Sequence, residues 1–171
     1  MGNFVFNVAR GRLRQYYDIV DSNAAATGPI TGGADAALLA ILFAAAALEA
    51  DATLADYDDL AALIAAAGND EITGGTAARK ILTDTELAAS APTDATNVLD
   101  LDIISDIVWT ALTCTAPASN APVGALIICY KPTVASGDAA IVPLTKHDFL
   151  VTPDGTDVTA QIAATGFYRS Q

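Results

Sequence analysis

A chain of 171 residues is the size of one domain, and with 53% hydrophobic residues it can bury a core without metals or disulfides. Eight basic against twenty acidic residues give a net charge of −12, which argues against nucleic acid as a partner because phosphate binding needs Lys and Arg. The apolar run at residues 36–48 is shorter than the roughly 20 residues that cross a bilayer, so we expect no membrane partner.

Charge is distributed unevenly along the chain. Arg10, Arg12 and Arg14 give residues 1–17 a net charge of +3, whereas residues 18–171 carry five basic and twenty acidic residues, a net charge of −15. The sequence therefore predicts a basic segment attached to an acidic body.

The basic segment also has the pattern of a strand. Phe4, Phe6 and Val8 alternate with their neighbours at the period of two that is typical of β-structure. We predict that residues 1–20 form a basic N-terminal arm with the first strand, which could be one long bent strand, and that residues 21–171 form the acidic body.

The run at residues 36–50 fits two structures. Ala and Leu favour a helix by propensity, whereas Leu39, Ile41 and Phe43 alternate as in a buried strand. The residues alone leave both open for residues 38–44.

A helix-bearing insertion is predicted at about residues 53–68. Leu60 and Leu63 have the spacing of one helix face, and Asp56 or Asp58 can cap the first turn. Acidic side chains at this end are stabilised by the helix dipole, so we interpret the cluster as structural rather than as a metal site.

The remaining elements read as short strands separated by turns. We predict strands at residues 76–83, 106–113, 124–130, 149–152 and 157–162, with a loop at residues 84–99. Pro153 and Gly155 predict a tight turn, and a hairpin, between the last two strands. The expected fold is mainly β, a β-sandwich or jelly-roll-like single domain with one short amphipathic helix.

The two cysteines favour a cytosolic folding site. Cys114 and Cys129 lie in apolar stretches without Cys-x-x-Cys spacing, which favours buried free thiols over a disulfide.

Groups that carry chemistry are scarce, so we expect no enzyme, no catalytic residue and no cofactor. His147 is the one histidine, and no nucleophile elbow or phosphate-binding loop is present. A dyad of His147 with either cysteine is a minor alternative. Asp100, Asp102 and Asp106 could offer oxygens to a cation, but they lack the spacing of a calcium loop, and we expect solvated surface and no metal site.

Three segments carry a resemblance to small structural proteins of tailed bacteriophages, in particular the capsid decoration or cement class. They are NFVFNVARGR at residues 3–12, ARKILTD at 78–84 and PLTKHDFLVTPDGTDVTAQI at 143–162, with Gly166-Phe167 after them. The resemblance implies a β-sandwich in which residues 38–44 form a strand, and assembly with copies of the same chain. Such proteins often carry an aromatic residue ahead of the Ala-Arg pair, where this chain has Thr76 and Ala77.

The function that this resemblance implies is mechanical. A capsid decoration protein, here expected as a homotrimer on the outer capsid surface of the virion, binds the major capsid protein and bridges its subunits. We expect aromatic and Arg side chains to anchor it, because these residues dominate protein interfaces. The candidates are Phe4, Phe6, Arg10, Arg12, Arg14, Tyr16 and Tyr17.

Three alternatives stay open. Phe4, Phe6 and Val8 could face the core of the protein instead of a partner. The protein could belong to the tail, baseplate or head fibre of the virion. A third reading, an acidic DNA mimic that inhibits a nucleic-acid enzyme, follows from the twenty carboxylates but fits the basic segment poorly.

Overall fold

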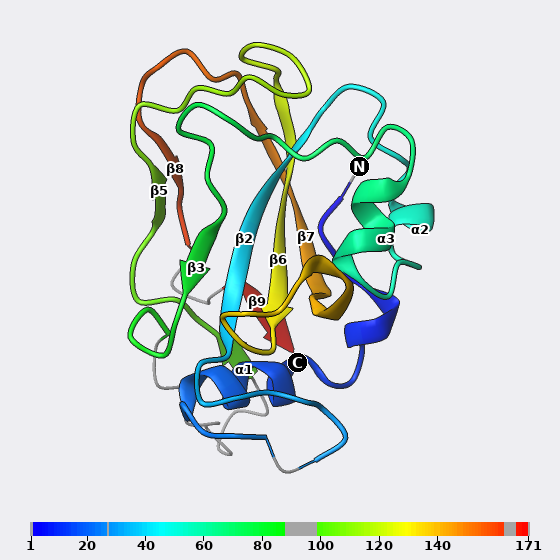
Figure 1. Ribbon diagram of the computed structural model, residues 1–171, viewed down its shortest axis with the longest axis vertical. Helices are drawn as coiled ribbons and strands as arrows, with labels where there is room; N and C mark the ends of the chain where they lie inside the picture. The colour runs from blue at the N-terminus through cyan, green and yellow to red at the C-terminus, as the bar shows by residue number, and fades with distance from the viewer. Residues whose placement is uncertain (1, 27, 88–98, 163–166, 171) are drawn as a thin grey trace.

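A five-stranded antiparallel sheet in the order β1-β7-β6-β2-β3 organises the protein (Figure 1). The computed structural model describes residues 2–26, 28–87, 99–162 and 167–170. The strands of this sheet are β1 (Phe4–Val5), β2 (Ala37–Ala44), β3 (Lys80–Leu82), β6 (Val123–Lys131) and β7 (Val142–Val151). Two small antiparallel sheets pair β4 (Leu99–Leu101) with β9 (Tyr168–Ser170) and β5 (Ile107–Trp109) with β8 (Val158–Ala160).

The central strand β2 is buried on both faces, which explains its continuous apolar sequence. All eight of its residues are buried. Leu39 and Phe43 belong to one core cluster, and Leu38 and Leu42 belong to the other. A strand between two cores needs apolar side chains at every position, so helix propensity is overridden, and the strand interpretation of residues 38–44 is confirmed.

Different elements cover the two faces of the large sheet. Leu54 of α2 (Asp51–Leu54) and Leu60 and Leu63 of α3 (Leu60–Ala65) pack on one face, which we call the α3 face. The other face, called the α1 face, packs the helix α1 (Leu13–Asp21) together with both small sheets. Figure 1 shows α2 and α3 on one side of the sheet and β5 and β8 on the other.

The N-terminal prediction was wrong after its first residues. Only Phe4–Val5 form a strand, and they are followed by the 3-10 turn η1 (Asn7–Ala9) and by α1. The buried residues of α1 are Leu13, Tyr16, Tyr17 and Val20, at i, i+3, i+4 and i+7. This is helical spacing, so burying these side chains together requires a helix rather than a strand.

Other elements agree with expectation in part. The mainly β fold class is confirmed, and the described residues contain three α-helices rather than one. The helix in the predicted insertion forms as α3, and its cap is Asp59, which accepts a hydrogen bond from the Ala62 amide, rather than Asp56 or Asp58. Asp59 lies directly before the first buried Leu, where a cap reaches the free amides.

The C-terminal strands form, but the last two do not make a hairpin. Gly155 takes a φ of 87°, as the predicted turn requires. The strands on either side pair elsewhere, however, since β7 pairs with β6 and β8 pairs with β5. The predicted loop at residues 84–99 falls mostly on residues 88–98, which lie outside the described residues, as does Gly166.

Candidate functional site

The structure divides the seven predicted interface residues into two groups. Phe6, Tyr16 and Tyr17 are buried and serve the core. The other four reach the surface to different degrees: Phe4 and Arg14 are half-buried, whereas Arg10 and Arg12 are exposed. The alternative that Phe6 faces the core therefore holds.

The buried aromatics hold α1 in place on the α1 face. The ring of Tyr16 lies 4.9 Å from that of Tyr130, and the Tyr17 hydroxyl donates a hydrogen bond to the Asp102 carbonyl. Burial raises the pKa of both Tyr16 and Tyr17, so neither side chain ionises near neutral pH. Arg10 and Arg12 therefore lie directly before a helix that is firmly packed on the sheet, and not on a separate N-terminal arm.

Arg10 and Arg12 form no ion pair with the described residues. Arg14 pairs with Asp18 at 3.0 Å, one turn along α1. In the described part of the chain, no carboxylate lies within salt-bridge distance of Arg10 or Arg12. These two side chains are the ones among the seven that remain free to contact a partner with their full charge.

The arrangement of charge along α1 opposes the helix dipole. Arg12 is the residue before the first turn, and Arg14 lies within that turn, where the dipole favours anions. The last turn contains no basic residue and ends with Asp21. An acidic surface bound at Arg10 and Arg12 would offset the unfavourable positive charge at this end.

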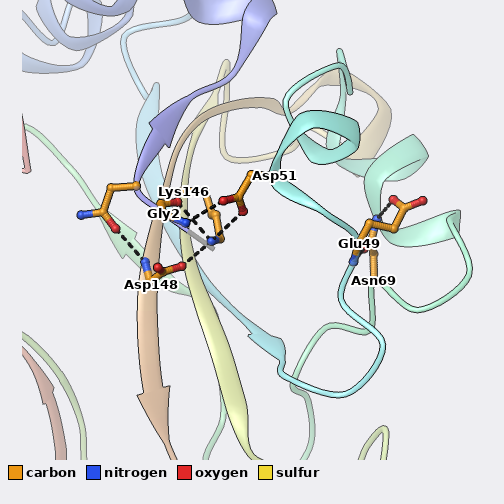
Figure 2. A network of polar contacts seen from close by, with 7 residues as sticks. Gly2, Glu49, Asp51, Asn69, Lys146 and Asp148 are labelled. Atoms are coloured by element: carbon orange, nitrogen blue, oxygen red, sulfur yellow. Dashed lines mark hydrogen bonds and ion pairs between the residues drawn. The ribbon is translucent and has the colours of Figure 1, made fainter.

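A buried lysine fastens the N-terminal residues to β7 and α2 (Figure 2). Lys146 is fully buried, and its Nζ donates to the Gly2 carbonyl at 3.2 Å and to Asp51 Oδ1 at 3.1 Å. A third hydrogen bond goes to the Asp148 carboxylate. The Gly2 amide also donates to Asp51 Oδ2 at 2.6 Å, and the Asp148 amide donates to the Asn3 side chain at 2.9 Å. All three ammonium protons have acceptors, as a buried charge requires.

The electrostatics of this network favour an ionised Asp51. Burial acts to raise its pKa, but the hydrogen bonds from the Gly2 amide and from Lys146 outweigh that effect, and the pKa lies below its ordinary value. The network therefore works as a structural tie between the chain start and the sheet.

Two further polar clusters close loops on the α3 side of the molecule. Buried Asn69 accepts a hydrogen bond from the Glu49 amide at 3.2 Å and donates to Glu49 Oε2 at 2.6 Å (Figure 2). The same Glu49 oxygen accepts a hydrogen bond from the Tyr57 hydroxyl. Arg79 donates to both oxygens of Glu71, at 2.8 and 2.7 Å, and to Asp138. The charge of Arg79 is thus neutralised by carboxylates of the same chain.

The structure does not assemble the thiol dyad that the sequence left open. Both cysteines are free and buried, as predicted. Cys129 belongs to the α3-face cluster, and burial raises its pKa. Cys114 belongs to the opposite cluster and donates to the Ala118 carbonyl at 3.6 Å. His147 instead pairs with Thr145, at 2.9 Å between Nε2 and Oγ1.

The described residues offer neither a metal-binding cluster nor a membrane-spanning helix. They contain no group of three or more His, Cys, Asp or Glu side chains that could hold a metal ion. The side chain of Asp100, one of the three aspartates considered for a cation, lies outside the described residues. None of the helices in the described ranges has the length and apolar content that crossing a bilayer requires.

Comparison with known proteins adds no relative. No protein-family model matches the chain, and no curated protein or solved structure is significantly similar to it.

Proposed function

We propose that this chain is a capsid decoration protein of a tailed bacteriophage, which binds the outer shell and bridges major capsid subunits. In this proposal it acts on the virion surface as a homotrimer, and it stabilises the head because shell opening must also break its contacts. Binding free energy takes the place of catalysis. The resemblance of residues 3–12, 78–84 and 143–162 to such proteins is its starting point.

The observation that carries the proposal is the pair Arg10 and Arg12, which lie directly before the packed helix α1. Both are exposed, and neither forms an ion pair with the described residues. Arg10 and Arg12 are exposed, whereas Phe6, Tyr16 and Tyr17 around them in the sequence are buried. The buried neighbours of these arginines hold their backbone in place, so binding has to order only the side chains, and Arg forms bidentate contacts with carboxylates. The partner surface that fits them is acidic.

The acidic remainder of the chain supports the same arrangement. Residues 18–171 carry a net charge of −15, so the protein would approach an acidic shell with its basic segment and turn its negative surface outward. Crowded particles that carry such a surface repel each other, which keeps them dispersed.

The test is to mix the purified protein with phage shells that lack a decoration protein and to locate added density by cryo-electron microscopy. Density at the junctions of capsomers is the expected result. Density at the tail or baseplate alone would move the protein to the tail, baseplate or head-fibre class. An absence of added density anywhere on the particle would overturn the virion proposal.

A charge variant tests the binding surface. Arg10→Ala/Arg12→Ala should weaken shell binding at least tenfold at low salt, and the salt dependence of binding should decrease. Lys80→Ala/Lys131→Ala removes the same charge elsewhere and should leave binding within about twofold. Point variants are needed because deletion of residues 1–17 would remove Phe6, Leu13 and Tyr17 from the core.

A further inference from the structure

A cavity of about 470 Å³ lies on the α1 face of the large sheet, near its β1 edge. Its walls come from β1, β6 and β7 on one side and from residues at the ends of β8 and β9 on the other. The apolar part of the lining includes Val5, Leu126, Ile128, Phe149, Phe167 and Tyr168. Pockets for small molecules are typically ~300–1,000 Å³ and mostly apolar, and this cavity has both properties.

A polar pair interrupts the apolar lining. Thr145 is 2% exposed, and its Oγ1 lies 2.9 Å from Nε2 of His147; both residues line the cavity. Within the described residues, no group forms a hydrogen bond with the other ring nitrogen of His147, Nδ1. His147 is half-buried and lines the cavity, so Nδ1 can form a hydrogen bond with a molecule that binds there.

The charges around the cavity determine the class of molecule that it suits. Burial, followed by the positive charge of Lys146, lowers the pKa of His147 although Asp148 opposes the shift, so the ring is neutral at pH 7. The Asp148 carboxylate is held by Lys146. Among the described lining residues there is thus no unpaired cation for an anionic ligand and no unpaired anion for a cationic one.

We propose that this cavity binds a small neutral molecule that is largely aromatic and that carries one hydrogen-bonding group directed at the Thr145–His147 pair. Aromatic walls favour stacked or edge-to-face rings. A single hydrogen-bonding group on the ligand would satisfy the polar pair without bringing an unpaired charge into the apolar site. This site does not depend on the capsid proposal.

The experiment uses N-phenyl-1-naphthylamine, a neutral probe that consists of a naphthyl and a phenyl group joined by one N–H group and that fluoresces in apolar surroundings. Titration into the full chain should give a saturable increase in fluorescence with one site per chain. Ala160→Phe, which adds a ring at a buried lining position, should weaken probe binding at least tenfold. Ala62→Phe adds the same ring at an exposed position of α3, and it should leave probe binding unchanged.

A measurement on the unmodified protein covers the case in which Ala160→Phe fails to fold. Amide resonances of Thr145, His147 and Phe149 should shift on addition of the probe, while those of Leu60 and Leu63 in α3 should not. A linear, non-saturating signal, or shifts confined to other residues, would overturn the proposal. Shifts of the cavity residues that follow protein concentration instead of probe concentration would overturn it as well, because a second copy would then occupy the cavity.

Discussion

The two faces of the large sheet are closed in different ways. The α3 face is covered mainly by α2, α3 and the start of the chain, and Lys146 ties these pieces together through Asp51 and Gly2. The α1 face is covered by α1 and by strands from four separate parts of the chain, and it contains the 470 Å³ cavity. The cavity therefore lies on the face where short strands from separate parts of the chain meet.

Neighbouring residues of β6 show the difference most directly. Ile127 and Ile128 are 0% and 1% exposed, so burial alone does not distinguish them. Ile127 belongs to the α3-face core, whereas Ile128 lines the cavity. A side chain beside open space makes fewer van der Waals contacts on that side.

The largest effect on stability is expected for alanine substitutions of Ile127 and Ile128. Ile127→Ala should lower the free energy of unfolding by about 4 kcal/mol, near the top of the range for buried Ile, because closely packed neighbours leave a new cavity. Ile128→Ala should cost about 2–3 kcal/mol, because some of its contacts are already missing. Urea denaturation of both variants measures the two losses. Equal losses would show that the faces are packed equally well.

The next prediction compares two substitutions of Lys146. It tests whether the α3 face needs the charge of this side chain or only its volume. Lys146→Ala should cost about 2–3 kcal/mol, whereas Lys146→Met, which keeps the length of the side chain, should remain within about 1 kcal/mol of the natural protein. Asp51 and Asp148 are 31% and 36% exposed, so water can solvate them when the lysine is absent. Urea denaturation of both variants measures the loss in the free energy of unfolding. Equal losses would show that the charge of Lys146, and not its volume, stabilises the protein.

A smaller effect depends on pH. The pKa of Asp51 is lowered in the folded protein, so its stabilising contribution is complete above the ordinary value of 3.8 and is lost as the pH falls through the folded value. Asp51→Asn should therefore be less stable than the natural protein by under about 1 kcal/mol at pH 7. The difference should disappear in strong acid. A difference in thermal midpoint that is independent of pH would contradict the ionic role of Asp51.

The smallest effect on stability is expected for the two exposed arginines, although their removal should have the largest effect on shell binding. Arg10→Ala/Arg12→Ala should change the free energy of unfolding by no more than about 0.5 kcal/mol, because both side chains are exposed and without salt bridges among the described residues. Calorimetry of the double variant checks this. A loss above about 1 kcal/mol would show that the arginines support α1 instead of a partner contact.

Elements with a strong local pattern could be predicted from the sequence. The long apolar run of β6, the short helix α3 and the turn at Gly155 all form near their predicted positions. The sequence before α1 favours a strand through the alternation of Phe4, Phe6 and Val8, and this pattern competes with the i, i+3, i+4, i+7 spacing of the helix itself. For β2, propensity and periodicity conflicted, and only burial on both faces decides between them.

The candidate site was predictable only at the level of residue type. Aromatic and Arg residues near the chain start were recognised as candidate anchors, but burial separates Phe6, Tyr16 and Tyr17 from Arg10 and Arg12. The cavity could not be predicted from the sequence, because its lining residues come from distant parts of the chain, in or next to β1, β6, β7, β8 and β9.

By itself the sequence determined the mainly β class, the turn at Gly155, the free cysteines and the basic start on an acidic chain, since each follows from composition or from neighbouring residues. Only the tertiary structure decided which arginines stay exposed, why a lysine is buried and where the sheet leaves a cavity. Lys146 and Asp51 are 95 residues apart in the chain, and β7 and β8 pair away from each other despite the turn between them. Such contacts depend on packing free energy summed over distant segments, which no local pattern records.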